Sequence, residues 1–296
     1  MAYTPQQIDL TDLATVEEMQ QLSSGNADED YLQLLITAAS TSILEVLGRH
    51  IEYVLPPDWT ASKAYSNGQL IVPSGGANPG GYSFRCTSGG VSASVEPTSF
   101  PQTVGNTLND GSLIWANVGQ GVNTSEVLNG LGNNRLGILG FPVNSVGSVE
   151  IYGVFQTLAP SDSTDGVVAE IYGTRQRGML YFRGIATWPF SGATNFVRGP
   201  QNIRVNYSKG WWTPGQAVTL LSGTPSSPAG PPSGVTALPI DLKNAATELA
   251  ILKYRQRNRL GDSSVGEGPQ RVTYFMKEMT DSVANVLNRY SDKSPW

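Results

Sequence analysis

The chain has 296 residues, a formal net charge of −5, one cysteine and one histidine. Cys86 is the only cysteine in the sequence, which excludes an internal disulfide. Because His50 is the only histidine, the sequence cannot supply the ligands of a Cys/His zinc cluster. Only 15% of the residues are charged, while 33 are glycine and 19 are proline, a composition that favours a β-rich protein over a helical bundle.

No apolar run approaches the roughly 18 residues that a membrane-spanning helix needs, and no secretion signal opens the sequence. We therefore expect a soluble protein made in a reducing cytoplasm, without a membrane partner. The charge is unevenly distributed. Residues 1–58 hold ten acidic side chains and one basic one, whereas residues 59–238 and 239–296 each hold nine basic and seven acidic. This asymmetry suits head-to-tail contact between copies, and equally a pair of well-solvated helices.

Helical periodicity opens and closes the chain. Apolar residues recur at helical spacing from Tyr31 to Leu47, and Gly48 follows the last of them. A second amphipathic helix is expected over residues 238–261, with Pro239 and Asp241 in its first turn and Gly261 behind it. A final helix is expected from Val272 to Tyr290. We predict that these segments pack together.

Residues 58–120 have the pattern of a small inserted β module, with short apolar runs between Gly, Pro and Ser. Two interpretations of its aromatic residues are open. They could form a platform that stacks on sugar rings, or they could be the core that so small a module needs. The candidate platform consists of Trp59, Tyr65, Tyr82 and Trp115.

Residues 121–221 return to β patterning, and Asn202 to Tyr207 alternate strictly between polar and apolar. Such alternation predicts an antiparallel sheet with one face in water. Residues 222–238 are rich in Ser, Gly and Pro and are predicted to be a linker. The predicted fold is α+β. Residues 1–57 and 239–296 form a small helical bundle, and the sequence between them forms a central antiparallel β domain and the inserted β module.

Cations concentrate at the end of the 238–261 helix. Dipole complementarity in solvent is one explanation for them, and contact with acid on a neighbouring copy or with phosphate is the other. A terminal tryptophan could likewise dock on a partner or fold back. The candidate contact residues are Lys253, Arg255, Arg257, Arg259 and Trp296.

No catalytic, cofactor-binding or metal-binding residues are predicted. The Gly-rich stretch at residues 74–81 lacks the Gly-Lys-Ser/Thr of a P-loop, and Gly130, Gly132 and Gly137 miss the dinucleotide-binding spacing. A Ser/His/Asp triad would have to use His50, which follows a predicted helix end, where an imidazole commonly acts as a cap. We expect a protein that is not an enzyme.

Several motifs, taken in order, resemble the head-to-tail connector proteins of tailed bacteriophages, the adaptor or head-completion family. Gly48-Arg49 closes the helix that runs to Leu47, Phe141-Pro142-Val143 with Ser145-Val146 leads into a strand, and a helix opens on Pro239 with Asp241-Leu242 and ends in Tyr254 and Arg257. The resemblance covers about residues 10–55 and 121–290. The insert departs from the pattern, and its Trp59 to Gly68 and Asp110 to Trp115 segments are similar to chitin-type carbohydrate-binding modules.

The resemblance implies a structural protein of the virion neck, made in the host bacterial cytoplasm. It implies a ring of twelve copies beneath the portal protein, a docking surface for a tail or stopper protein, and a lumen through which genomic DNA passes without sequence-specific binding. The weak net charge agrees with passage rather than grip. The alternative hypothesis is a carbohydrate-binding accessory protein of a fibre or baseplate.

Overall fold

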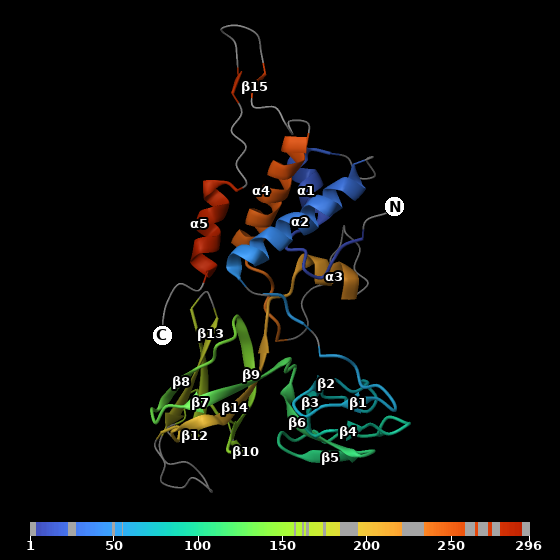
Figure 1. The fold of residues 1–296 in the computed structure, drawn as a ribbon, viewed down its shortest axis with the longest axis vertical. Helices are drawn as coiled ribbons and strands as arrows, with labels where there is room; N and C mark the ends of the chain where they lie inside the picture. The colour runs from blue at the N-terminus through green and yellow to red at the C-terminus, as the bar shows by residue number, and fades with distance from the viewer. Residues whose placement is uncertain are drawn as a thin grey trace. The chain divides into compact units, whose positions relative to one another are not determined.

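A computed structural model describes residues 4–22, 28–48, 51–54, 56–156, 158–161, 163, 166–173, 176–183, 195–220, 234–257, 264–265, 272–273 and 279–291 (Figure 1). The chain forms two units. The helical unit comprises residues 1–52 and 211–296, and the β unit comprises residues 53–210. The predicted α+β class is confirmed, with helices and mainly antiparallel sheets in one chain.

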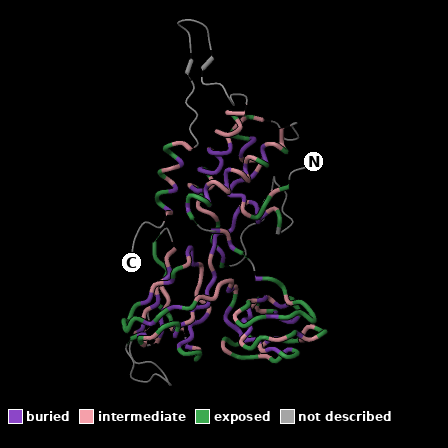
Figure 2. Tube along the Cα trace, in the orientation of Figure 1, coloured by how far each residue is buried: buried purple, intermediate pink, exposed green. Residues whose placement is uncertain are grey.

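The helical unit is built from both ends of the chain. Helix α2 packs against α4, α4 packs against α5, and α1 contacts both α2 and α4. Figure 2 marks the buried residues that run along these helices. The elements are α1 (Leu13–Gln20), α2 (Glu29–Leu47), α3 (Pro214–Leu220), α4 (Ile240–Gln256), α5 (Asp281–Tyr290), β15 (Ser264–Val265) and β16 (Val272–Thr273).

The two long helices confirm the apolar periodicity. In α2 the buried positions include Leu32, Ile36 and Ile43, and Gly48 ends the helix with a φ of 67°, in the left-handed region that glycine adopts without strain. In α4, Leu242 and Leu249 are buried. The facing apolar stripes of α2 and α4 therefore bury each other, as their spacing predicts.

The predicted final helix from Val272 to Tyr290 is wrong in its first part. Val272 lies in β16, which pairs with β15, and α5 begins only at Asp281. Thr280 sets that start because its hydroxyl accepts a hydrogen bond from the backbone N–H of Val283. A cap thus divides one apolar repeat into a strand and a shorter helix.

The β unit contains two four-stranded sheets that enclose one core, and a module with a third such sheet. The sheet orders are β10-β9-β14-β7 and β11-β12-β13-β8 in the core pair, and β2-β3-β6-β5 in the module, where β1 also pairs with β4. Among the strand pairings that the structure describes in the core pair, only β11 with β12 is parallel.

The module strands are β1 (Ala64–Tyr65), β2 (Leu70–Ile71), β3 (Tyr82–Ser88), β4 (Gly90–Val91), β5 (Thr107–Asp110) and β6 (Leu113–Gln120). The remaining strands are β7 (Thr124–Gly130), β8 (Arg135–Gly137), β9 (Val143–Ile151), β10 (Val154–Gln156), β11 (Leu158–Ala159), β12 (Gly166–Tyr172), β13 (Arg177–Arg183) and β14 (Gly199–Lys209).

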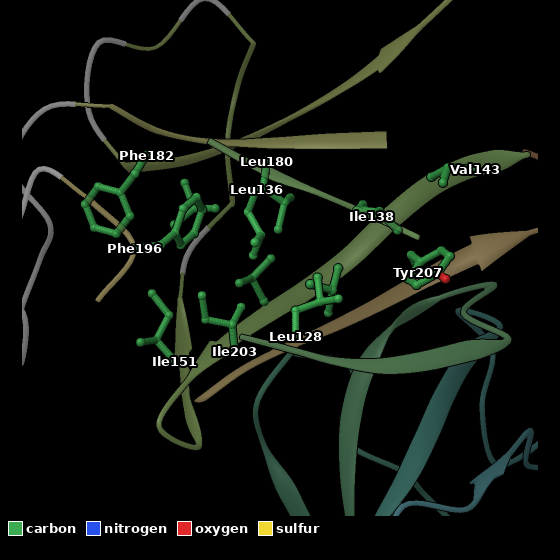
Figure 3. Packing of buried hydrophobic residues seen from close by; sticks show 13 residues of the cluster. Leu128, Leu136, Ile138, Val143, Ile151, Leu180, Phe182, Phe196, Ile203 and Tyr207 are labelled. Carbon is green, nitrogen blue, oxygen red and sulfur yellow. The ribbon is translucent and has the colours of Figure 1, made fainter. Parts of the chain in front are cut away.

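The core between the two sheets is apolar and aromatic. Leu128, Ile151 and Ile203 from one sheet meet Leu180 and Phe182 from the other (Figure 3). Each comes from the apolar half of an alternating strand, so the period-2 pattern of the sequence builds this layer directly.

Much of the opposite face of β9 and β14 is buried, which corrects the expectation for the polar half of the alternation. Ser148 is 1% exposed, Glu150 4% and Asn206 0%. The Ser148 hydroxyl donates to the carbonyl of Val118 in the module strand β6. Polar residues are therefore buried here because the inserted module contacts this face.

Candidate functional site

The predicted basic end of α4 forms a joint inside the helical unit. Asp28 precedes α2, and its Oδ2 accepts hydrogen bonds from the Tyr254 hydroxyl at 2.7 Å and from Arg257 Nη1 at 2.7 Å. The Arg257 guanidinium also lies 4.2 Å from the centroid of the Tyr254 ring and 6.0 Å from that of Tyr31. Arg257 therefore links the start of α2 to the end of α4.

This joint changes the titration of the groups in it. The hydrogen bond from Tyr254, followed by that from Arg257, holds the pKa of Asp28 below its ordinary value. The same bond with Asp28 raises the pKa of Tyr254. The carboxylate therefore stays ionised and the phenol stays protonated near neutral pH, which keeps the ion pair intact.

The other predicted contact residues have different surroundings. Arg255 is exposed, and its Nε donates to Gln20 Oε1 at 3.3 Å. Lys253 is half-buried in the last turn of α4. Arg259 and Trp296 lie outside the described residues. Contact of the candidate residues with another copy or with a portal stays a prediction. Among the candidates that the structure describes, Arg255 is the exposed one.

The four aromatics of the candidate glycan platform do not share an exposed face. Trp115 is fully buried and Tyr65 is 4% exposed, with their rings in an edge-to-face contact at 5.0 Å. Trp59 and Tyr82 are half-buried and pack against the same cluster. Stacking on a sugar needs an open ring face, so this arrangement favours the module-core interpretation.

Asp110 explains why the tryptophans occupy those positions. Its Oδ2 accepts from Nε1 of Trp59 at 2.8 Å and from Nε1 of Trp115 at 2.9 Å, and its Oδ1 accepts from the backbone N–H of Ala93. A buried indole N–H requires such a partner. The motif from Asp110 to Trp115 therefore has a structural role in the module, because the Asp110 carboxylate holds both tryptophans in place.

A buried polar network between module and sheet was not foreseen from the sequence. Arg85 in β3 and Glu150 in β9 form an ion pair at 2.6 Å, with 5% of each side chain exposed. Asn206 Nδ2 donates to Glu150 Oε1 at 2.9 Å and to the Ser148 hydroxyl at 3.0 Å. A usable signal was present, because Glu150 and Asn206 stand on the polar half of strands whose apolar half is core.

Within the described part of the chain, no group of three or more His, Cys, Asp or Glu residues could hold a metal ion. Cys86 is buried, and that burial raises the pKa of its thiol. Among the helices that the structure describes, none is sufficiently long and apolar to span a membrane.

No protein-family model and no curated protein matches the sequence. Among solved structures, the chain is similar to a chain of "Neck of empty GTA particle computed with C6 symmetry". The two are 12% identical, the comparison covers 100% of this chain and 96% of that chain, and the TM-score is 0.37. A likeness at this level does not establish a common fold.

Proposed function

We propose that this protein is a structural, non-enzymatic component of a phage-like virion neck, a head-to-tail adaptor. Copies would form a ring, twelve in number, between a portal protein and a tail or stopper protein, with genomic DNA passing through the lumen. The protein would be made in the host cytoplasm and function in the assembled particle.

One observation carries this proposal. Two of the three motifs on which the resemblance to connector proteins rests occupy the joints of the helical unit, and the third leads into β9 of the β unit. Gly48 ends α2, Tyr254 and Arg257 bind Asp28, and Asp241 accepts a hydrogen bond from the Tyr290 hydroxyl of α5 at 2.8 Å. The first and last motifs therefore describe a helical scaffold, which is what a ring-forming adaptor would need.

Exposed apolar side chains of the helical unit offer material for contacts between copies. Val46 near the end of α2 is 55% exposed, Leu34 is 43% exposed and Ile240 at the start of α4 is 68% exposed. A closed ring uses heterologous contacts, in which one patch meets a different patch of the next copy. Such contacts would withdraw these side chains from water.

The test is to image purified particles by electron microscopy with the protein carrying a fused label. We expect density in a ring at the neck, and density confined to fibres or capsid faces would contradict the proposal. A monomer in solution before assembly is compatible with it. As a narrower arm, Arg255→Glu should impair ring formation while Arg135→Glu, an equal charge reversal in the β unit, should not.

A further inference from the structure

A cleft of about 490 Å³ opens in the β unit where the module meets the polar face of β9 and β14. Its volume lies within the range of roughly 300–1,000 Å³ that is usual for small-molecule sites. Arg85, Glu150 and Asn202 are the buried members of its lining, and Arg204 is half-buried. Asn67 and Tyr152 are exposed members.

The cleft has more positive than negative charge. Glu150 is bound by Arg85, so Arg204 has no carboxylate of its own, and among the described residues it forms no ion pair. Its Nη1 reaches only the Ser125 hydroxyl, at 3.4 Å. In addition, Nε of the 4%-exposed Arg85 has no hydrogen-bond partner. An anion in the cleft would offset this surplus.

Desolvation and the neighbouring cation both lower the pKa of Arg204. Burial, and then the positive charge of Arg85, lower the pKa of its guanidinium, while Glu150 raises it. Arginine remains protonated in proteins, so the site keeps its charge. A planar guanidinium with free N–H groups matches the geometry of a carboxylate.

The remaining lining is rich in neutral hydrogen-bonding groups and has one exposed aromatic ring. Asn67, Thr87 and Gln201 contribute amide and hydroxyl groups, and Tyr152 is 56% exposed. Tyr152 and Gln201 both have positive φ values, 51° and 47°. Tyr152 adopts this conformation in the two-residue turn between β9 and β10, and Gln201 adopts it in the irregularity of β14 between Gly199 and Ile203.

We propose that this cleft binds a saccharide that carries a carboxylate. Arg204 would pair with the carboxylate, Asn67, Thr87 and Gln201 would exchange hydrogen bonds with hydroxyl groups, and the Tyr152 ring would lie against a sugar face. This site is distinct from the buried aromatics of the module, and the inference does not depend on a position in the virion neck.

The test uses the full chain on an array of acidic oligosaccharides, including sialyllactose and trigalacturonate, with lactose and maltotriose as neutral counterparts. Hits are then measured by isothermal titration calorimetry. We expect at least one acidic oligosaccharide to bind, and its neutral counterpart to bind at least about tenfold more weakly, because a charge-assisted hydrogen bond is lost. Binding to none of the acidic oligosaccharides would overturn the proposal.

Variants assign the binding to the cleft. Arg204→Gln should weaken the acidic saccharide about tenfold or more, while Arg135→Gln, an equal loss of charge in β8, should not change it. Asn67→Ala, at an exposed position, provides a second cleft variant, and thermal unfolding checks that each variant is folded. The proposal would be overturned if the Arg204→Gln and Asn67→Ala proteins both bound the acidic saccharide as tightly as the unaltered chain does. It would also be overturned if inorganic sulfate bound as tightly as the best saccharide.

Discussion

One ion pair in the helical unit and one in the β unit lie in contrasting environments. In the helical unit, Asp28 and Arg257 join two helix ends at the surface, where 39% and 30% of their side chains are exposed. In the β unit, Arg85 and Glu150 lie beneath the module with 5% of each exposed. Water screens the charges of the first pair, whereas the buried charges of the second pair are neutralised by each other. Loss of one member should therefore destabilise the protein far more at the Arg85–Glu150 pair than at the Asp28–Arg257 pair.

The largest effect is expected from Arg85→Ala. The substitution leaves Glu150 buried without its counter-ion, and such a loss typically costs about 3–5 kcal/mol of unfolding free energy. Guanidinium denaturation of the full chain measures it. Arg255→Ala, at an exposed arginine, is the matched control. A cost for Arg85→Ala below about 1 kcal/mol would show that the buried pair is not set apart from a surface pair.

In the helical unit the corresponding large effect should come from apolar packing instead. Leu249 in α4 is 1% exposed, so Leu249→Ala should destabilise the protein by roughly 2–5 kcal/mol. Ile240→Ala, at a residue 68% exposed, should stay within about 0.5 kcal/mol. Thermal and denaturant unfolding compare the two variants, and equal losses would contradict the assignment of the α4 face.

Asp9 is a buried acidic residue of the helical unit. It is 1% exposed, and burial raises its pKa to about 6 against hydrogen bonds from the Gln6 N–H, the Thr37 hydroxyl and Gln33 Nε2. The folded state thus binds the Asp9 proton more tightly than the unfolded state does. Stability from this group is complete below about pH 4 and is lost as the pH rises to about 6.

Asp9→Asn tests this dependence. The shift corresponds to about 3 kcal/mol, so the free energy of unfolding of the unaltered chain should fall by up to that amount between about pH 4 and pH 6. The variant should lack the decline, and urea unfolding at several pH values measures both. Groups with lowered pKa values, such as Asp28, contribute below this window. Parallel pH profiles for the two proteins would refute the assignment.

The smallest effect is expected from Arg255→Glu. Its side chain is exposed and its hydrogen bond to Gln20 is long, so the unfolding free energy should change by less than about 0.5 kcal/mol. A larger loss, measured by the same denaturant titration, would indicate that this end of α4 is bound within the subunit. That result would leave the proposed contact between copies without its exposed cation.

The sequence predicted an element well where the apolar periodicity and the residue that ends the element agreed. The stripe from Tyr31 to Leu47 with Gly48 behind it became α2, and the alternation at Asn202 to Tyr207 lies within β14. The repeat that begins at Val272 misled because Thr280 interrupts it with a cap. Periodicity reports which residues share a face, and it does not report where a helix begins.

The sequence by itself determined the α+β class, the main helices and strands, and the apolar half of each, because these depend on spacing along the chain. Only the tertiary structure decided which of the polar residues on the opposite faces are buried and which partners they bind. It placed Glu150 and Asn206 under the module beside Arg85, paired Arg257 with Asp28, and left Arg204 facing a cleft. Those partners are distant in sequence, and the environment of a charge is set by what folds against it.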